Sequence, residues 1–276
     1  MEEIMFLRIA AVIAAGGAAA YFDYKTGYIY DKITYPLIGA GIILNIYEQQ
    51  YLGIAIAAIM FVGGWLLYKT GKIGGGDVKL YAGIAAMLPF YHGAPFIVPV
   101  LLFSALTGVV FISAYYSIKY ARRGIDFELN KSGILRAIML LSAVLIYFIA
   151  ASSMLKGAQA FIYAVSIPLI AGCVFIALEK GIRKEFFLKK IKPRESEDDE
   201  VIALDFMESS GQKLPGLKPV MSRSEILGLE KTGIREILVY RNLPKFGPFI
   251  LAGIIIALIM LGTFPQLFVF SLPVFI

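Results

Sequence analysis

Residues 4–22 read IMFLRIAAVIAAGGAAAYF, a nearly continuous apolar run in which Arg8 is the one charged side chain. An α-helix needs about 20 such residues to cross the hydrocarbon core of a bilayer. Acidic Glu2 and Glu3 precede the run, and no small-residue cleavage pattern follows it, so it is not typical of a removable signal peptide. The run therefore predicts a first helix that remains in the membrane.

Comparable apolar runs recur along the chain, separated by short polar stretches. Hydrophobic residues make up 59% of the sequence and charged residues 17%, whereas soluble domains are about half apolar and a quarter charged. Spans are expected at residues 4–22, 33–47, 51–68, 77–91, 95–116, 134–151, 158–178 and 246–264. Because the second and fourth runs are short, we predict an all-α fold class, a polytopic transmembrane helical bundle of about 6–8 spans.

The positive charges favour one side of such a bundle. If every run crosses, one set of loops begins near Asp23, Lys69, Lys119 and Glu179. Nearly all of the 26 Lys and Arg residues then lie on that side, with Arg8 and Lys156 as exceptions. The positive-inside rule identifies this side as cytoplasmic. The net charge of +6 thus indicates orientation in the cytoplasmic membrane and not nucleic-acid binding.

Residues 179–245 differ in composition from the rest of the chain. They begin with a basic stretch and continue with the acidic run Glu195–Glu200, and Pro215, Gly216 and Pro219 interrupt them further on. Such charge runs are usually solvated, and the basic part is suited to lie against lipid head groups. We therefore expect a transmembrane catalytic bundle at 1–178, a small cytoplasmic domain at 179–245, and a last transmembrane helix with a tail at 246–276.

Two carboxylates stand at the ends of apolar runs, where a charged group is costly. Asp23 closes the first run, and Asp77 opens the fourth after Gly74, Gly75 and Gly76. Three glycines permit unusual backbone angles and the close approach of another chain, as a site for an extended peptide requires. The plainer interpretation is a flexible turn followed by an N-cap aspartate. The predicted topology places Asp23 and Asp77 at the same membrane boundary.

Other catalytic chemistries lack the residues that they need. His92 is the only histidine, and it is predicted in a turn at the opposite side of the membrane. The single cysteine, Cys173, lies within an apolar run, where a packing role is expected. A histidine triad, a cysteine-rich zinc site and a disulfide framework are therefore excluded, and neither a metal nor a cofactor is predicted.

Two segments together resemble the signature regions of the type IV prepilin peptidases, most closely the archaeal preflagellin (prearchaellin) and prepilin branch. They are FDYKTGYIYD at 22–31 and GGGDVKL at 74–80, which contains the Gly-x-Gly-Asp motif. The resemblance implies that Asp23 and Asp77 are the catalytic pair and that Gly74 and Gly76 are motif glycines. Gly75, Lys79 and Lys25 are assigned to support of the substrate site.

The same resemblance implies a membrane-embedded aspartyl endopeptidase. Its substrates would be precursors of archaellin or type IV pilin-like proteins, from which a short basic leader is removed at the cytoplasmic boundary. The partners implied are these precursors and membrane lipids, with no nucleic acid. The sequence departs from the family at Tyr30, where a proline is common. It also lacks the cysteine-rich insert of many bacterial members, so proteolysis is predicted without methylation.

Three alternatives remain open at the level of sequence. A presenilin-type protease shares the Gly-x-Gly-Asp motif, but no Pro-Ala-Leu occurs in this chain. A transporter would use Asp23 and Asp77 as a proton or cation site. A membrane scaffold would be organised by residues 179–245.

Overall fold

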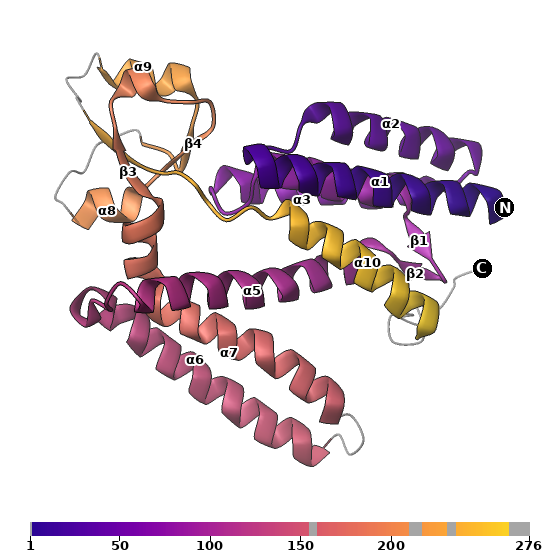
Figure 1. The fold of residues 1–276 in the computed structure, drawn as a ribbon. Coiled ribbons are helices and arrows are strands. Elements are labelled where there is room, and N and C mark those ends of the chain that lie inside the picture. Colours follow the sequence, from indigo (N-terminus) through magenta and orange to yellow (C-terminus); the bar gives the residue numbers. More distant parts are fainter. Residues whose placement is uncertain (1, 155–158, 210–216, 231–235, 265–276) are drawn as a thin grey trace. The chain divides into compact units, whose positions relative to one another are not determined.

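The structure is a computed structural model that describes residues 2–154, 159–209, 217–230 and 236–264 (Figure 1). It divides into two compact units, of which the first comprises the described part of Met1–Thr107 and Lys245–Ile276. The second unit comprises the described part of Gly108–Pro244.

The first unit is a helical bundle. Its helices are α1 (Glu2–Thr26), α2 (Asp31–Tyr47), α3 (Tyr51–Lys69), α4 (Gly75–Met87), the first part of α5 (Ile97–Ala121) and α10 (Gly247–Thr263). Helix α4 packs against α2 and α3, and α10 packs along α1 although more than 200 residues separate them in sequence (Figure 1). Every side chain from Leu80 to Leu88 is buried. Helix α4 is therefore the core element of this unit.

Polar side chains hold the end of α4 at which its carbonyl groups lack helical partners. Arg8 of α1 is buried and donates to the Met87 carbonyl at 2.6 Å and to the Glu48 carboxylate at 2.8 Å. Asn45 of α2 donates through Nδ2 to the Ala86 carbonyl at 2.9 Å. The charge of Arg8 inside the first apolar run is thus used to fix α1 and α2 on α4.

The fourth helix is shorter than the predicted span at 77–91. It ends at Met87, and the strands β1 (Phe90–Tyr91) and β2 (Ala94–Pro95) form a small hairpin after it. Pro89 explains the difference, because proline disfavours a helical conformation of the preceding residue, and Leu88 has φ −130° and ψ 75°. The fifth helix begins at Ile97 and not at the predicted position 95, because Pro95 belongs to this hairpin.

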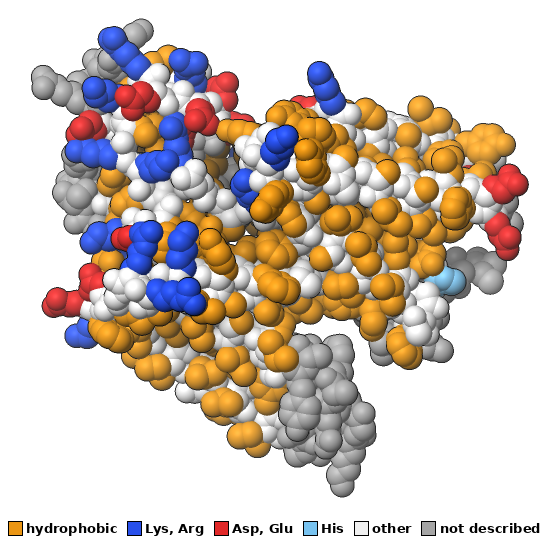
Figure 2. Space-filling model, viewed as in Figure 1, with side chains coloured by type: hydrophobic (Ala, Val, Ile, Leu, Met, Phe, Trp, Pro, Cys, Tyr) orange, Lys and Arg blue, Asp and Glu red, His pale blue; other side chains and the backbone are white. Residues whose placement is uncertain are grey.

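The helices present apolar surfaces suited to lipid. Within the described residues, α1, α3, α5 and α6 are long and apolar enough to cross a membrane. On α3 the side chains of Leu52, Ile59 and Leu66, seven residues apart, are each more than half exposed, which defines an outward apolar stripe. Figure 2 shows hydrophobic side chains over much of the visible helical surface. The predicted polytopic helical bundle is confirmed, but the structure is mainly and not entirely α-helical, because it also contains two small sheets.

The second unit combines a helical pair with a small mixed domain. Helices α6 (Phe127–Met154) and α7 (Gln159–Ile182) pack closely, with Gly133 against the backbone of Ile176 and Ala177. A π-helical turn, Arg183–Phe187, leads into a four-stranded antiparallel sheet of order β3-β6-β4-β5. The strands are β3 (Leu188–Ile191), β4 (Glu200–Ile202), β5 (Val220–Met221) and β6 (Ile237–Tyr240), with helices α8 (Leu204–Ser209) and α9 (Arg223–Glu230).

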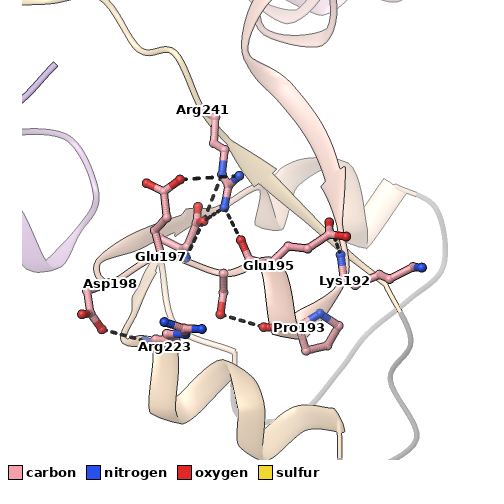
Figure 3. A network of polar contacts seen from close by, with 9 residues as sticks. Lys192, Pro193, Glu195, Glu197, Asp198, Arg223 and Arg241 are labelled. Carbon is pink, nitrogen blue, oxygen red and sulfur yellow. Dashed lines mark hydrogen bonds and ion pairs between the residues drawn. The ribbon is translucent and has the colours of Figure 1, made fainter. Parts of the chain in front are cut away.

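Arg241, which follows β6, is the centre of a network of polar contacts at this sheet (Figure 3). Glu200 is buried and receives two donors of Arg241, one of them Nε at 3.0 Å, while Arg241 also donates to the Glu195 carbonyl at 2.8 Å. The backbone N–H of Glu197 donates to Glu200 at 3.0 Å. The acidic run that the sequence predicts to be solvated therefore includes one residue that is a buried structural group.

The start of α6 differs from the prediction, and some predicted positions lie outside the described residues. Helix α6 begins at Phe127, before the predicted position 134, because the Asp126 carboxylate accepts the Leu129 N–H at 2.9 Å and caps it. Position 158, Pro215, Gly216 and the tail after 264 lie outside the described residues. The division at 1–178, 179–245 and 246–276 stays a prediction.

The close contact between α2 and α4 is testable at Gly41. A Cβ atom there would lie 2.5 Å from the Ala86 carbonyl carbon, whereas a Cβ at Gly39 on the same helix meets nothing within 4 Å. We expect Gly41→Ala to lower the free energy of unfolding by about 1–3 kcal/mol, because backbone must move apart. Thermal unfolding in detergent measures this, and Gly39→Ala is the control. Equal midpoints for the two variants would contradict the contact.

The Arg241–Glu200 pair gives a second prediction. Arg241→Met leaves the Glu200 carboxylate buried without its cation, which we expect to cost about 2–3 kcal/mol. Hydrogen exchange of β4 and β6 in the full chain should then become faster. Lys190→Met is the control, because its ion pair with Glu236 is exposed and contributes little. If both variants exchange alike, the pair does not stabilise the sheet.

Candidate active site

Both sequence-predicted aspartates lie at one end of the first unit, where α1 ends and α2, α4 and α10 begin. Asp23 is in the last turn of α1, and Asp77 is in the first turn of α4. The two carboxyl groups are close enough for their negative charges to repel each other. The structure therefore brings together two acids that are 54 positions apart in the sequence.

The Asp23 side chain is buried, with 6% of its surface exposed. Its Oδ2 atom accepts the backbone N–H of Gly247, the first residue of α10, at 2.7 Å. The first amides of a helix have no partners within the helix and carry partial positive charge. Asp23 thus joins the end of α1 to the beginning of α10.

Asp77 occupies the third position of α4 and is half-buried. Its carboxyl group lies against Gly74, the residue that precedes the helix and has an extended backbone. The N-cap is therefore Gly74 and not Asp77, which corrects the plainer interpretation of the sequence.

The three glycines serve close approach and not unusual dihedral angles. Gly74 has φ −70° and ψ 141°, and Gly75 and Gly76 belong to α4. A Cβ at Gly76 would lie 2.8 Å from the Cβ of Ile29, whereas one at Gly75 would make ordinary contact with the Tyr68 ring. The expectation of unusual backbone angles at 74–76 is therefore wrong, whereas that of a close approach holds at Gly76. Glycine at 76 lets α4 begin directly against the loop that follows α1.

Lys79 lies two residues after Asp77 and connects α4 to α2. Its ammonium group donates to the Asp31 carboxylate at 2.5 Å and lies 5.1 Å from the centre of the Tyr35 ring. The side chain of Lys79 is 27% exposed and that of Asp31 is 52% exposed. Lys79, at the basic position of the motif, thus holds the beginnings of α4 and α2 together beside Asp77.

Lys25 does not enter the group around the aspartates. Its side chain is exposed and lies 3.4 Å from the Tyr21 hydroxyl, with the ammonium 5.7 Å from the Tyr21 ring centre. This arrangement of a lysine over an exposed aromatic ring at a helix end is typical of the membrane interface.

A shallow hollow opens beside Asp23, at the end of α1 and the loop before α2. The rings of Phe22 and Tyr30 form one wall, with centres 5.3 Å apart and nearly perpendicular planes. Its lining consists of Phe22, Tyr28, Ile29, Tyr30, Asp31 and Lys32. Its charged groups are the Asp31 carboxylate, which pairs with Lys79, and the Lys32 ammonium, so its aromatic rings are the part suited to an extended peptide.

Sequence reasoning missed the contribution of α10 to this site. Lys245 donates to the Tyr24 carbonyl and Gly247 to Asp23, and neither belongs to the two signature segments. The one local indication of this contribution in the sequence is Lys-Phe-Gly-Pro at 245–248, which leads into the last span. Among the residues that the structure describes, no three His, Cys, Asp or Glu side chains gather as a metal site.

Comparison with known proteins places this site in a family context. A model of the type IV leader peptidase family matches residues 10–113, which include both aspartates. The prepilin peptidase EppA of Methanothermobacter thermautotrophicus is 34% identical over 96 residues, a match that covers 32% of this chain and 25% of that protein. No solved structure matches the chain. The segment 10–113 is thus similar to the type IV leader peptidase family, and the chain spans about a quarter of the length of the curated relative that it matches.

Proposed function

We propose that this protein is an aspartyl endopeptidase of the membrane, with Asp23 and Asp77 as its catalytic pair. The observation that carries the proposal is the convergence of these two carboxyls at one end of a lipid-suited bundle. The similarity of residues 10–113 to the type IV leader peptidase family supports peptidase chemistry. The relative is matched over only 25% of its length, so the activity of the whole chain is part of the proposal.

Two adjacent carboxyls can divide the two roles of peptide hydrolysis. Because like charges at short range oppose each other, one group holds a proton while the other is ionised. The carboxylate takes a proton from water, whose oxygen attacks the scissile carbonyl carbon, and the neutral acid donates its proton to the carbonyl oxygen. The C–N bond then breaks as the amide nitrogen receives a proton, which yields a free carboxylate and a free amine.

The substrate that fits this place is a type IV pilin-like or archaellin precursor. Such a precursor has a short basic leader before a hydrophobic helix, and the cut lies between them. The hollow at the end of α1 offers the leader aromatic rings, while the apolar faces of the helices suit the hydrophobic segment. A site at the end of a span suits a bond at the membrane boundary.

The orientation proposed is a cytoplasmic active site in the cytoplasmic membrane. Lys25, Lys79 and Lys245 are at the same end of the unit as the two aspartates, and Glu2 and Glu3 begin α1 at its other end. This charge difference supports the cytoplasmic assignment, since cationic loops remain inside. Lipid head groups are the proposed partners of the exposed lysines.

Replacement of either aspartate tests the proposal. We expect Asp23→Asn and Asp77→Asn each to reduce cleavage of a pilin or archaellin precursor by at least about 100-fold, because each removes a proton-transfer group. The full chain is purified in detergent and products are identified by mass spectrometry. Thermal unfolding confirms that the variants remain folded.

A matched control is available at Asp205, an exposed acid in α8. Asp205→Asn should retain cleavage within about twofold, since surface substitutions have small effects. Retained cleavage by both folded Asp23→Asn and Asp77→Asn would contradict the proposal. Absence of processing by the unmodified chain, together with a cation flux that requires both aspartates, would favour the transporter.

The Lys79–Asp31 contact gives a separate prediction. Lys79→Met should lower kcat/KM about three- to tenfold, because the beginning of α4 loses a tie to α2 next to Asp77. A Lys79→Asp and Asp31→Lys double variant should recover part of the loss relative to Lys79→Asp alone. Cleavage kinetics of the purified chain measure both effects. A Lys79→Met variant as active as the unmodified protein would show that this contact does not position Asp77.

A further inference from the structure

We propose that Gly247 and Lys245, at the start of the last helix, are positioning residues that hold Asp23 in its catalytic place. This inference rests on the proposed function and extends the site beyond residues 10–113, the segment that matches the family. It assigns to α10 a role in the reaction in addition to crossing or covering the bundle.

A backbone hydrogen bond holds the Asp23 side chain. The Gly247 N–H donates to Asp23 Oδ2 at 2.7 Å, and both residues are buried. Hydrogen bonds to a charged acceptor are stronger than neutral ones, and a buried carboxyl without donors is costly. The Gly247 amide therefore fixes the direction of the Asp23 side chain.

Position 247 requires glycine. A Cβ atom on residue 247 would lie 2.9 Å from the Cβ of Asp23 and 3.0 Å from its Oδ2. Real Cβ atoms avoid such distances, so a larger residue must push the carboxyl or the helix away. A second glycine of α10 is also in close contact with a neighbouring helix, since a Cβ at Gly253 would lie 2.1 Å from Ser104 Oγ of α5.

Lys245 holds Gly247 next to Asp23. Lys245 donates its ammonium to the Tyr24 carbonyl in the last turn of α1, and the ammonium lies 5.5 Å from the Tyr24 ring centre. A cation favours the carbonyl end of a helix. Because Tyr24 follows Asp23 directly, this contact brings the start of α10 onto the same turn that carries the acid. The charge of Lys245 also attracts the Asp23 carboxylate.

Cleavage kinetics of the full chain in detergent test this role. Lys245→Met should lower kcat roughly tenfold with KM nearly unchanged, and Lys245→Arg should recover most of the rate because it keeps the charge and the donor. Lys69→Met is the control, since Lys69 is another exposed lysine at a helix end, placed 3.7 Å from the Trp65 ring centre. A kcat for Lys245→Met equal to that of Lys69→Met would overturn the role of Lys245.

Gly247 is tested by a matched pair of glycine variants on α10. Gly247→Ala should lower kcat by roughly tenfold or more, whereas Gly262→Ala should not, because a Cβ at Gly262 meets only the Tyr91 hydroxyl at 3.8 Å. Equal kcat values for the two folded variants would contradict the positioning role.

A measurement without substrate separates this inference from the proposed function. In the full chain, Asp23→Ala should speed hydrogen exchange of the Gly247 amide by roughly tenfold, because the acceptor is removed. The neighbouring Pro248 has no N–H, which simplifies the assignment. Unchanged exchange would overturn the inference even if precursors are cleaved. Faster exchange of the Gly247 amide in a chain that cleaves no precursor would contradict the proposed function alone.

Discussion

A carboxyl group buried among apolar helices must find hydrogen-bond donors, and Asp23 finds one in the backbone N–H of Gly247 at 2.7 Å. The contact joins two helices that stand at opposite ends of the sequence. It requires glycine at 247, a helix that begins at that residue, and Lys245 on the last turn of α1. The packing of α10 along α1 is the consequence, since an acid placed in this turn needs that partner.

The same principle of partnered polar groups applies to both ends of α4. At its beginning, the Asp77 carboxyl lies against Gly74, and Lys79 pairs with Asp31 of α2. At its end, Arg8 and Asn45 donate to the carbonyls of Met87 and Ala86. Between these ends every side chain from Leu80 to Leu88 is buried. Polar contacts therefore hold both ends of a core helix whose middle is held by apolar packing.

The apolar runs predicted the helices well, because lipid and core both require contiguous apolar residues. The aspartates were predicted from two short segments, but their surroundings were not. Gly247 escaped notice because a backbone donor has no sequence signature and lies 224 positions from its acceptor. The role of Gly76 was misjudged, since the close approach of Ile29 is a tertiary contact. The sheet at 188–240 was not predicted either, because strands of two to four residues carry too little periodicity.

The central claim is that Asp23 and Asp77 share one hydrolytic centre. It is tested most directly by cysteine cross-linking in membranes, with Asp23→Cys and Asp77→Cys combined in a Cys173→Ala background, since Cys173 is the only native cysteine. The account predicts that a short bifunctional thiol reagent joins the two positions within one chain, which protease cleavage between them reveals. Failure to cross-link, with thiol reagents reaching the two cysteines from opposite sides of the membrane, would contradict it.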